Sequence, residues 1–159
     1  MKTQRNLGIW VLVGCVLLCA SCISDGMSEA TEKFLMRPTN DQRKAILQYS
    51  PRRQVDLYLW AMLAEHPPDL GLADSVASNG AKIVPALKQR LIEGDDDMDA
   101  MHLIDVFVRM HELGSYPIAS DRKTMRLLEK QVGLMNDAVW KRLSAQMLDD
   151  IRDPTRRVD

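Results

Sequence analysis

The sequence has no cysteine beyond residue 22. In a chain of 159 residues the only cysteines are Cys15, Cys19 and Cys22. If residues 1–21 are removed during maturation, for which the reasons follow, Cys22 alone remains. No disulfide can then form within the mature chain, even in an oxidising compartment. The stability of the fold must therefore come from packing.

Aromatic residues and strand patterns are also scarce. Aromatics make up 5% of the chain, whereas methionine occurs 10 times. No segment shows sustained period-two alternation of apolar and polar residues, the pattern of a half-buried strand. Glycine and proline lie at breaks between segments rich in helix formers. We therefore predict an all-α protein.

The chain has no excess of positive charge. Its 21 basic and 22 acidic residues give a net charge of −1, which becomes −3 without Lys2 and Arg5. Domains that bind nucleic acid usually carry a strong basic excess. We expect no large basic face, and no nucleic-acid partner.

The motifs of common enzymes are missing. The three histidines are His66, His102 and His111. The sequence HEL at 111–113 lacks the second histidine of a zinc-protease helix, and the chain has no G-x-S-x-G elbow and no phosphate-binding loop. Glu65 and His66 are adjacent and could transfer a proton, but so could many helix ends. We expect no catalytic residues and no cofactor; a small hydrolase stays open as a second alternative.

The N-terminus has the three parts of a secretory signal. Lys2 and Arg5 form a basic start, an uncharged run covers 7–19, and small residues follow at 20 and 21. A helix of 13 residues spans roughly 20 Å, less than the ~30 Å hydrocarbon core of a bilayer. A cleaved signal is therefore favoured over a short uncleaved anchor.

The sequence around the expected cut resembles the lipobox of bacterial lipoproteins. Ala20 and Ser21 precede Cys22, although Cys19 stands where leucine is usual. LVGC, ending at Cys15, fits the box as well, but a cut there would leave only about eight apolar residues in the signal. Cys22 is therefore our predicted lipidation site. A secreted soluble product is the alternative.

The resemblance implies a location. Cys22 would carry a diacylglyceryl group and a further acyl chain on its new amine, and two or more chains anchor firmly. Ile23 follows, rather than the aspartate that retains lipoproteins at the inner membrane. The resemblance therefore favours the periplasmic side of the outer membrane in a host with two membranes, with membrane lipid as the first partner.

Residues 29–153 are expected to form a single helical domain, preceded by a tether at 22–28 and followed by a disordered tail at 154–159. Apolar periodicity and capping signals predict eight helices, at about 28–36, 40–49, 51–66, 69–79, 81–93, 96–113, 121–134 and 137–151. The helix at 96–113 is apolar over a wide arc and should be central.

The longer helices recur every 40 to 45 residues or so, the period of helical-pair solenoids. The stretch 82–110 resembles one junction of HEAT-type repeats, with Pro85 in a first helix, an acidic turn and a second helix. The resemblance implies a short α-solenoid of antiparallel helix pairs. An irregular helical bundle stays open beside it.

Two details concern the last two helices. We expect Ser120 to cap the helix at 121–134. For the helix at 137–151 we expect one inward stripe, made of Val139, Trp140, Leu143, Met147 and Ile151.

Two clusters could suggest a metal. Asp95, Asp96, Asp97 and Asp99 fail as a calcium loop, because Ala100 stands where an EF-hand has glycine and position 106 lacks its glutamate. Carboxylates in the first turn of a helix instead favour its partially positive end.

Thioether and imidazole groups on one helix suggest Cu(I). The candidate ligands are Met98, Met101, His102, Met110 and His111. Methionine in an apolar stripe is usually core filling, so we predict no metal site. A ligand- or Cu(I)-binding lipoprotein is the first alternative function.

These patterns together predict a membrane-anchored bacterial lipoprotein with a small helical domain. We expect the domain to act in the cell envelope as an adaptor that binds another protein. The concave face lined by the shorter helices is the expected surface. This functional part rests on fold-level analogy and on the motifs that are missing.

Overall fold

The computed structural model describes residues 28–64 and 67–153, and all regular elements in these ranges are helical. The all-α prediction is confirmed. The helices are α1 (Glu29–Leu35), α2 (Thr39–Ala45), α3 (Pro51–Ala64), α4 (Leu70–Ala77), α5 (Val84–Glu93), α6 (Asp97–Glu112), α7 (Arg122–Leu134) and α8 (Ala138–Arg152). Short 3₁₀ turns lie at Ile46–Gln48, Gly80–Lys82 and Ile118–Ser120. The expected signal segment, the tether up to residue 27, Cys15, Cys22, His66 and the tail from residue 154 lie outside the described residues.

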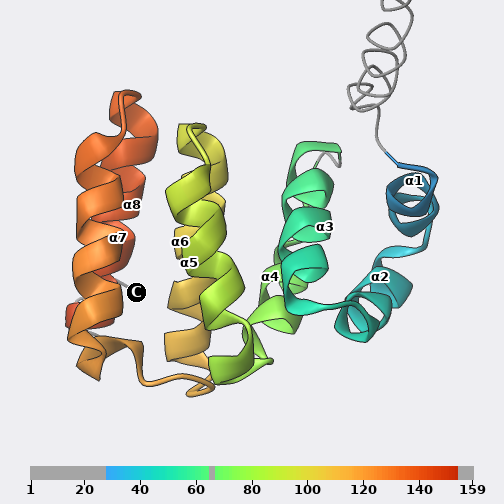
Figure 1. Ribbon diagram of the computed structural model, residues 1–159, viewed down its shortest axis with the longest axis horizontal. Helices are drawn as coiled ribbons and strands as arrows, with labels where there is room; N and C mark the ends of the chain where they lie inside the picture. Colours follow the sequence, from blue (N-terminus) through green and yellow to red (C-terminus); the bar gives the residue numbers. More distant parts are fainter. Residues whose placement is uncertain (1–27, 65–66, 154–159) are drawn as a thin grey trace, which may run out of the picture.

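The helices form two layers. In one layer α1 packs on α3, α3 on α5 and α5 on α7, and in the other α2 packs on α4, α4 on α6 and α6 on α8. We call these the odd layer and the even layer. Each odd helix also packs on the even helix that follows it. The described residues therefore form a row of antiparallel helix pairs (Figure 1).

Polar caps set the helix starts. Asp69, Asp96, Asp121 and Asp137 accept hydrogen bonds from the first backbone amides of α4, α6, α7 and α8. The prediction of Ser120 as the cap of α7 is wrong. Ser120 belongs to a 3₁₀ turn and donates to the Pro117 carbonyl. Asp121 caps instead, because its carboxylate accepts from two amides at once, those of residues 123 and 124.

The core follows the predicted stripes in the middle of the chain. All four apolar residues predicted for α5 are buried: Ile83, Val84, Leu87 and Leu91. Helix α6 packs against α3, α4, α5 and α8 and buries apolar residues over a wide arc, from Met101 to Met110. Its predicted central position is confirmed.

The predicted stripe of α8 is wrong in part. Val139 is 50% exposed and Leu143 36% exposed, whereas Ile151 is buried as predicted, and Ser144 and Leu148 complete the inward face. Helix α8 carries two apolar stripes, but it is the last helix and is covered by α6 and α7 from one side. Only one stripe can therefore be buried.

In the part of the chain that the structure describes, two glycines adopt positive φ angles. Gly80 has φ 58° in the turn between α4 and α5, and Gly114 has φ 62° after α6. A Cβ at Gly80 would lie 2.6 Å from the Ser115 carbonyl oxygen, whereas a Cβ at Gly114 would meet nothing within 4 Å. Ser115 Oγ also donates to the Ala77 carbonyl at 2.7 Å. The two loops at this end of the layers therefore touch closely at Gly80.

Candidate functional site

The ends of α3, α5 and α7 expose large apolar side chains. Trp60 and Leu63 are 40% and 42% exposed in the last turn of α3, Ile92 is 62% exposed near the end of α5, and Leu134 is 61% exposed at the end of α7. These three helices run in the same direction (Figure 1), so the helix ends that carry the four residues lie along one edge of the odd layer. We call this set the odd-layer edge.

A polar hollow of about 220 Å³ lies between α3 and α5 on this edge, lined in part by Arg53, Trp60 and Leu63. At its base Arg90 forms an ion pair with Asp99 at 2.7 Å. Burial raises the pKa of Asp99 above its ordinary value, although Arg90 opposes the change. The hollow is smaller than most ligand pockets, which measure about 300–1,000 Å³.

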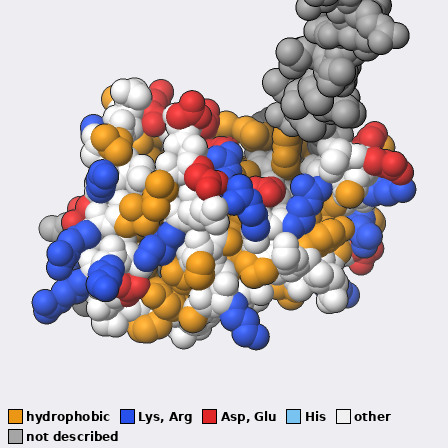
Figure 2. All heavy atoms as spheres, viewed as in Figure 1, with side chains coloured by type: hydrophobic (Ala, Val, Ile, Leu, Met, Phe, Trp, Pro, Cys, Tyr) orange, Lys and Arg blue, Asp and Glu red, His pale blue; other side chains and the backbone are white. Residues whose placement is uncertain are grey.

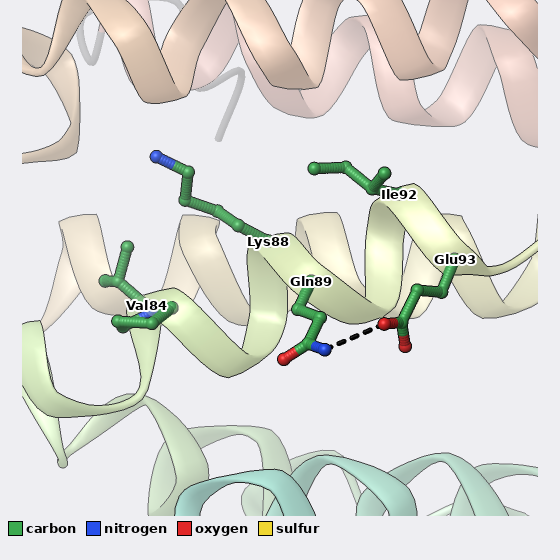
Figure 3. A pocket seen from close by; sticks show the side chains of 6 residues that line it. Val84, Lys88, Gln89, Ile92 and Glu93 are labelled. Atoms are coloured by element: carbon green, nitrogen blue, oxygen red, sulfur yellow. Dashed lines mark hydrogen bonds between the residues drawn. The ribbon is translucent and has the colours of Figure 1, made fainter.

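A second hollow of about 430 Å³ lies over α5 and is mainly apolar. Its lining residues are Val84, Pro85, Lys88, Gln89, Ile92 and Glu93 (Figure 3). Lys88 and Ile92 point to one side of α5, and Gln89 and Glu93 to the other. Lys88 Nζ donates to Thr124 Oγ1 on α7 at 3.3 Å. Glu93 accepts from Gln89 at 2.7 Å and from Arg52 on α3 at 3.1 Å. These bonds join α5 to both neighbours in the odd layer.

A third hollow of about 370 Å³ continues from the second. Ile92, Lys130 and Leu134 belong to its lining, together with residues of the α5–α6 turn. Ile92 lines both hollows, which are therefore adjacent, and Asp95, Asp96 and Asp97 also line the third. We call the two adjacent hollows the α5–α7 groove.

Positive charge is concentrated on helix α7. Helix α7 carries four basic residues, Arg122, Lys123, Arg126 and Lys130, and one acidic residue, Glu129. Glu129 is paired with Arg152 of α8 at 2.6 Å. Figure 2 shows lysine and arginine side chains gathered over the end of the molecule that α7 and α8 form. The even charge balance of the whole chain conceals this local excess, which the count within residues 122–134 would have revealed.

The residues considered for copper serve mainly in packing. Met101 and Met110 are buried, and Met98 and His111 are half-buried. The His102 ring meets Tyr58 edge-on, with centroids 6.3 Å apart. Burial lowers the pKa of His102 below its ordinary value. In the ranges that the structure describes, no group of three or more histidine, cysteine, aspartate or glutamate residues could hold a metal.

The acidic cluster belongs to the helix starts, as predicted. Asp96 caps α6 by accepting from the Asp99 amide at 2.8 Å. Asp97 accepts from the backbone amides of Asn136 and Asp137, at 2.7 and 2.6 Å. No local pattern predicts this second role, in which Asp97 connects the start of α6 to the turn between α7 and α8.

His102 lies beside Tyr58. Tyr58, whose pKa burial raises, donates its hydroxyl to the His102 carbonyl oxygen at 3.3 Å. His66, with its neighbour Glu65, lies outside the described residues. The site that this part of the molecule builds is a surface groove with exposed apolar groups, lysines and carboxylates.

Within the described part of the chain, no helix has the length and apolar character needed to cross a bilayer. No protein-family model matches the chain, and comparisons with curated proteins and with solved structures found no significant similarity.

Proposed function

We propose that this protein is a lipoprotein of the bacterial cell envelope whose helical domain binds another protein through the odd layer. The anchoring part of the proposal is supported by the basic, apolar and small-residue segments that precede Cys22. The same reasoning places the domain on the periplasmic side of the outer membrane in a host with two membranes, because Ile23 follows Cys22.

The binding part rests on one observation, the odd-layer edge. Single exposed apolar residues are normal on protein surfaces, but a cluster beside open hollows is typical of protein–protein contact sites. Trp60, Leu63, Ile92 and Leu134 are each 40% exposed or more, and all four lie along the same edge. The hollows beside them are open to solvent, which suits side chains of a partner better than a small ligand.

The anchor would bring this surface close to a bilayer. Seven residue steps separate Cys22 from the start of α1 at Glu29, and a chain of that length spans at most about 25 Å. A partner bound by the odd layer is therefore expected to be a membrane-associated or periplasmic protein.

The anchor is tested by the intact mass of the chain extracted from membranes. For the wild type we expect the mass of residues 22–159 plus a diacylglyceryl group, and for Cys22→Ser no lipid. Cys15→Ser is the matched control and should keep the lipid. An unmodified chain, or lipid that is lost only in Cys15→Ser, would contradict the assignment.

Binding is tested by photo-crosslinking in the cell, with a photoreactive residue placed at one position at a time. Leu63 and Ile92 report on the odd layer. Leu47, in the turn after α2, is the control, because it is 42% exposed, as is Leu63. We expect a discrete protein adduct from Leu63 or Ile92. If no position on either layer gives a protein adduct while the mass confirms the anchor, the binding function is wrong.

A further inference from the structure

Basic residues occupy positions on helix α7 where they lower its stability. Arg122 and Lys123 lie in the first turn, which contains no acidic residue, although the partially positive end of a helix favours carboxylates. Helices α1, α2 and α6 do have acidic residues in their first turns. Arg126 and Lys130 follow Arg122 at intervals of four residues, so like charges repel along one side of α7. Such a departure from the local rules of stability is expected at functional sites.

The carboxylates nearby do not balance this charge. Residues 121–134 contain four basic residues and two acidic ones, Asp121 and Glu129, so with every group counted at full charge the segment has a net charge of +2. Asp121 lies at the start of α7, and Glu129 pairs with Arg152 of α8. This end of the molecule therefore remains positive, as Figure 2 shows.

The positive charge is least opposed over the first two turns of α7. Arg122, Lys123 and Arg126 are exposed and form no ion pair in the described part of the chain. Lys130, one turn further on, lines the third hollow together with three aspartates of the α5–α6 turn, which oppose its charge. We call Arg122, Lys123 and Arg126 the α7 basic surface.

The α7 basic surface differs from the odd-layer edge because no large apolar side chain is exposed on it. In this part of α7 Met125 and Leu128 are buried and Leu127 is half-buried. The centre of a protein–protein interface is apolar, whereas basic residues alone attract a layer of anionic lipids. The surface therefore suits phospholipid headgroups better than a partner protein.

The expected anchor would bring a bilayer within reach of this surface. Six residue steps separate Cys22 from Ser28, and a chain of that length spans at most about 22 Å. Ser28 Oγ accepts a hydrogen bond from Arg53, which lines the polar hollow between α3 and α5. The chain therefore enters the domain beside the odd layer, the layer to which α7 belongs.

From these observations we propose that the α7 basic surface binds anionic phospholipid headgroups and holds the odd layer along the bilayer. This step rests on the proposed function, through the anchor at Cys22. A basic patch that acts together with an acyl chain anchors a protein more firmly than one chain alone. The odd-layer edge lies at the opposite end of α7, so it would remain open to a membrane-associated partner.

The test follows a fluorescent label on α7 while the full chain is held in vesicles by its own N-terminus. The label is attached at Gly133→Cys, where a Cβ meets nothing within 4 Å. Helical spacing places this position on the same side of α7 as Arg122 and Arg126. Asn40→Cys, exposed on α2 in the even layer, carries the control label. The chain without an added cysteine is the blank.

Two kinds of vesicle are compared, one of phosphatidylcholine alone and one that also contains phosphatidylglycerol, each with a quencher on the headgroups. We expect the Gly133 label to be quenched at least about twofold more strongly in the anionic vesicles. This excess should disappear near 1 M salt, where charges are screened beyond roughly 3 Å. The Asn40 label should show no excess in either condition.

Paired charge variants locate the contact in chains that carry the Gly133 label. Arg122→Gln/Arg126→Gln should abolish the excess quenching without lowering Tm, because the change removes repulsion within α7. Arg37→Gln/Lys44→Gln makes the same change of net charge on exposed residues near α2 and should keep the excess. A purely structural role of the two arginines would instead lower Tm.

Three results would overturn the proposal: equal quenching in the two kinds of vesicle, loss of the excess in both double variants, or an excess that survives Arg122→Gln/Arg126→Gln. A protein adduct in the cell from a photoreactive residue at Gly133, without excess quenching, would assign the surface to an acidic protein instead. The anchor and the partner contact are decided separately, by the intact mass and by adducts from Leu63 and Ile92.

Discussion

Gly80 gives a direct test of the packing between the two loops at one end of the layers. The change is Gly80→Ala, with Gly114→Ala as its control. Both residues have positive φ, 58° and 62°, so alanine pays a similar conformational cost of about 1–2 kcal/mol at either site. Only at Gly80 does the new Cβ also meet a backbone atom, the Ser115 carbonyl oxygen at 2.6 Å.

The size of the difference follows from that contact. A backbone carbonyl cannot move away as the end of a flexible side chain can, and forced overpacking typically costs about 1–3 kcal/mol. Alanine also reduces the entropy of the unfolded chain at both sites, which returns about 0.4–1 kcal/mol. We expect Gly114→Ala to lower the free energy of unfolding by about 1 kcal/mol or less, and Gly80→Ala by about 2–4 kcal/mol.

Urea denaturation followed by far-UV circular dichroism measures both values, with the wild type alongside. In thermal melts each kcal/mol should lower Tm by about 3–5 °C for a domain of this size. If the two substitutions destabilise the protein equally, within about 0.5 kcal/mol, the close approach of the loops is not what requires glycine at 80, and the reasoning is refuted.

Three further predictions concern single side chains. Asp121→Ala should lower the free energy of unfolding by about 1–2 kcal/mol at neutral pH. Hydrogen bonds from Thr124 and Tyr116 hold the pKa of the Asp121 carboxyl well below its ordinary 3.8, so this loss of stability should shrink as the pH falls through the folded-state pKa. A difference in stability between wild type and variant that stays constant from neutral to strongly acid pH would contradict the prediction. Ser144→Ala should raise the free energy of unfolding by about 1 kcal/mol, because the buried Ser144 hydroxyl has no hydrogen-bond partner in the described part of the chain. A clear loss of stability in the variant would show that the hydroxyl does have a hydrogen-bond partner. Burial lowers the pKa of His102 below 6.5. The wild type should therefore lose stability as the pH falls below about 6.5, because the unfolded chain then takes up a proton more readily than the folded chain does. His102→Gln should flatten this part of the plot of unfolding free energy against pH, and identical slopes in the two proteins would contradict the explanation.

Local patterns predicted the fold well where one element alone decides the outcome. Pro85 near the start of α5 and the stripe from Ile83 to Leu91 are properties of one segment, and the structure buries that stripe as predicted. The choice of Asp121 over Ser120 could not be predicted by preference alone, because both residue types cap helices well.

The candidate site was harder to predict, because it depends on which helices are neighbours. The stripe of α8 that contains Val139 and Leu143 is as apolar as a core stripe, and nothing local to that helix shows that its neighbours cover only the other side. The groove likewise exists only because α5 and α7 pack side by side. The basic residues of α7 are visible in the sequence, but the overall net charge of −1 averages them with the acidic residues of the chain.

The row of helix pairs also has a mechanical consequence. If the chain is held at Cys22 as proposed, a pulling force from a bound partner would enter the domain at α1 and act on one helix pair after another. The first resistance would come from Arg53 on α3, whose guanidinium donates to Ser28 Oγ at 3.1 Å and to Thr31 Oγ1 at 2.6 Å. Because each pair contacts mainly its neighbours in the row, such a load would peel the pairs away in sequence from the anchored end. A partner held at the odd-layer edge on α5 and α7 would be released late in that process, after α1 and α2 had already given way.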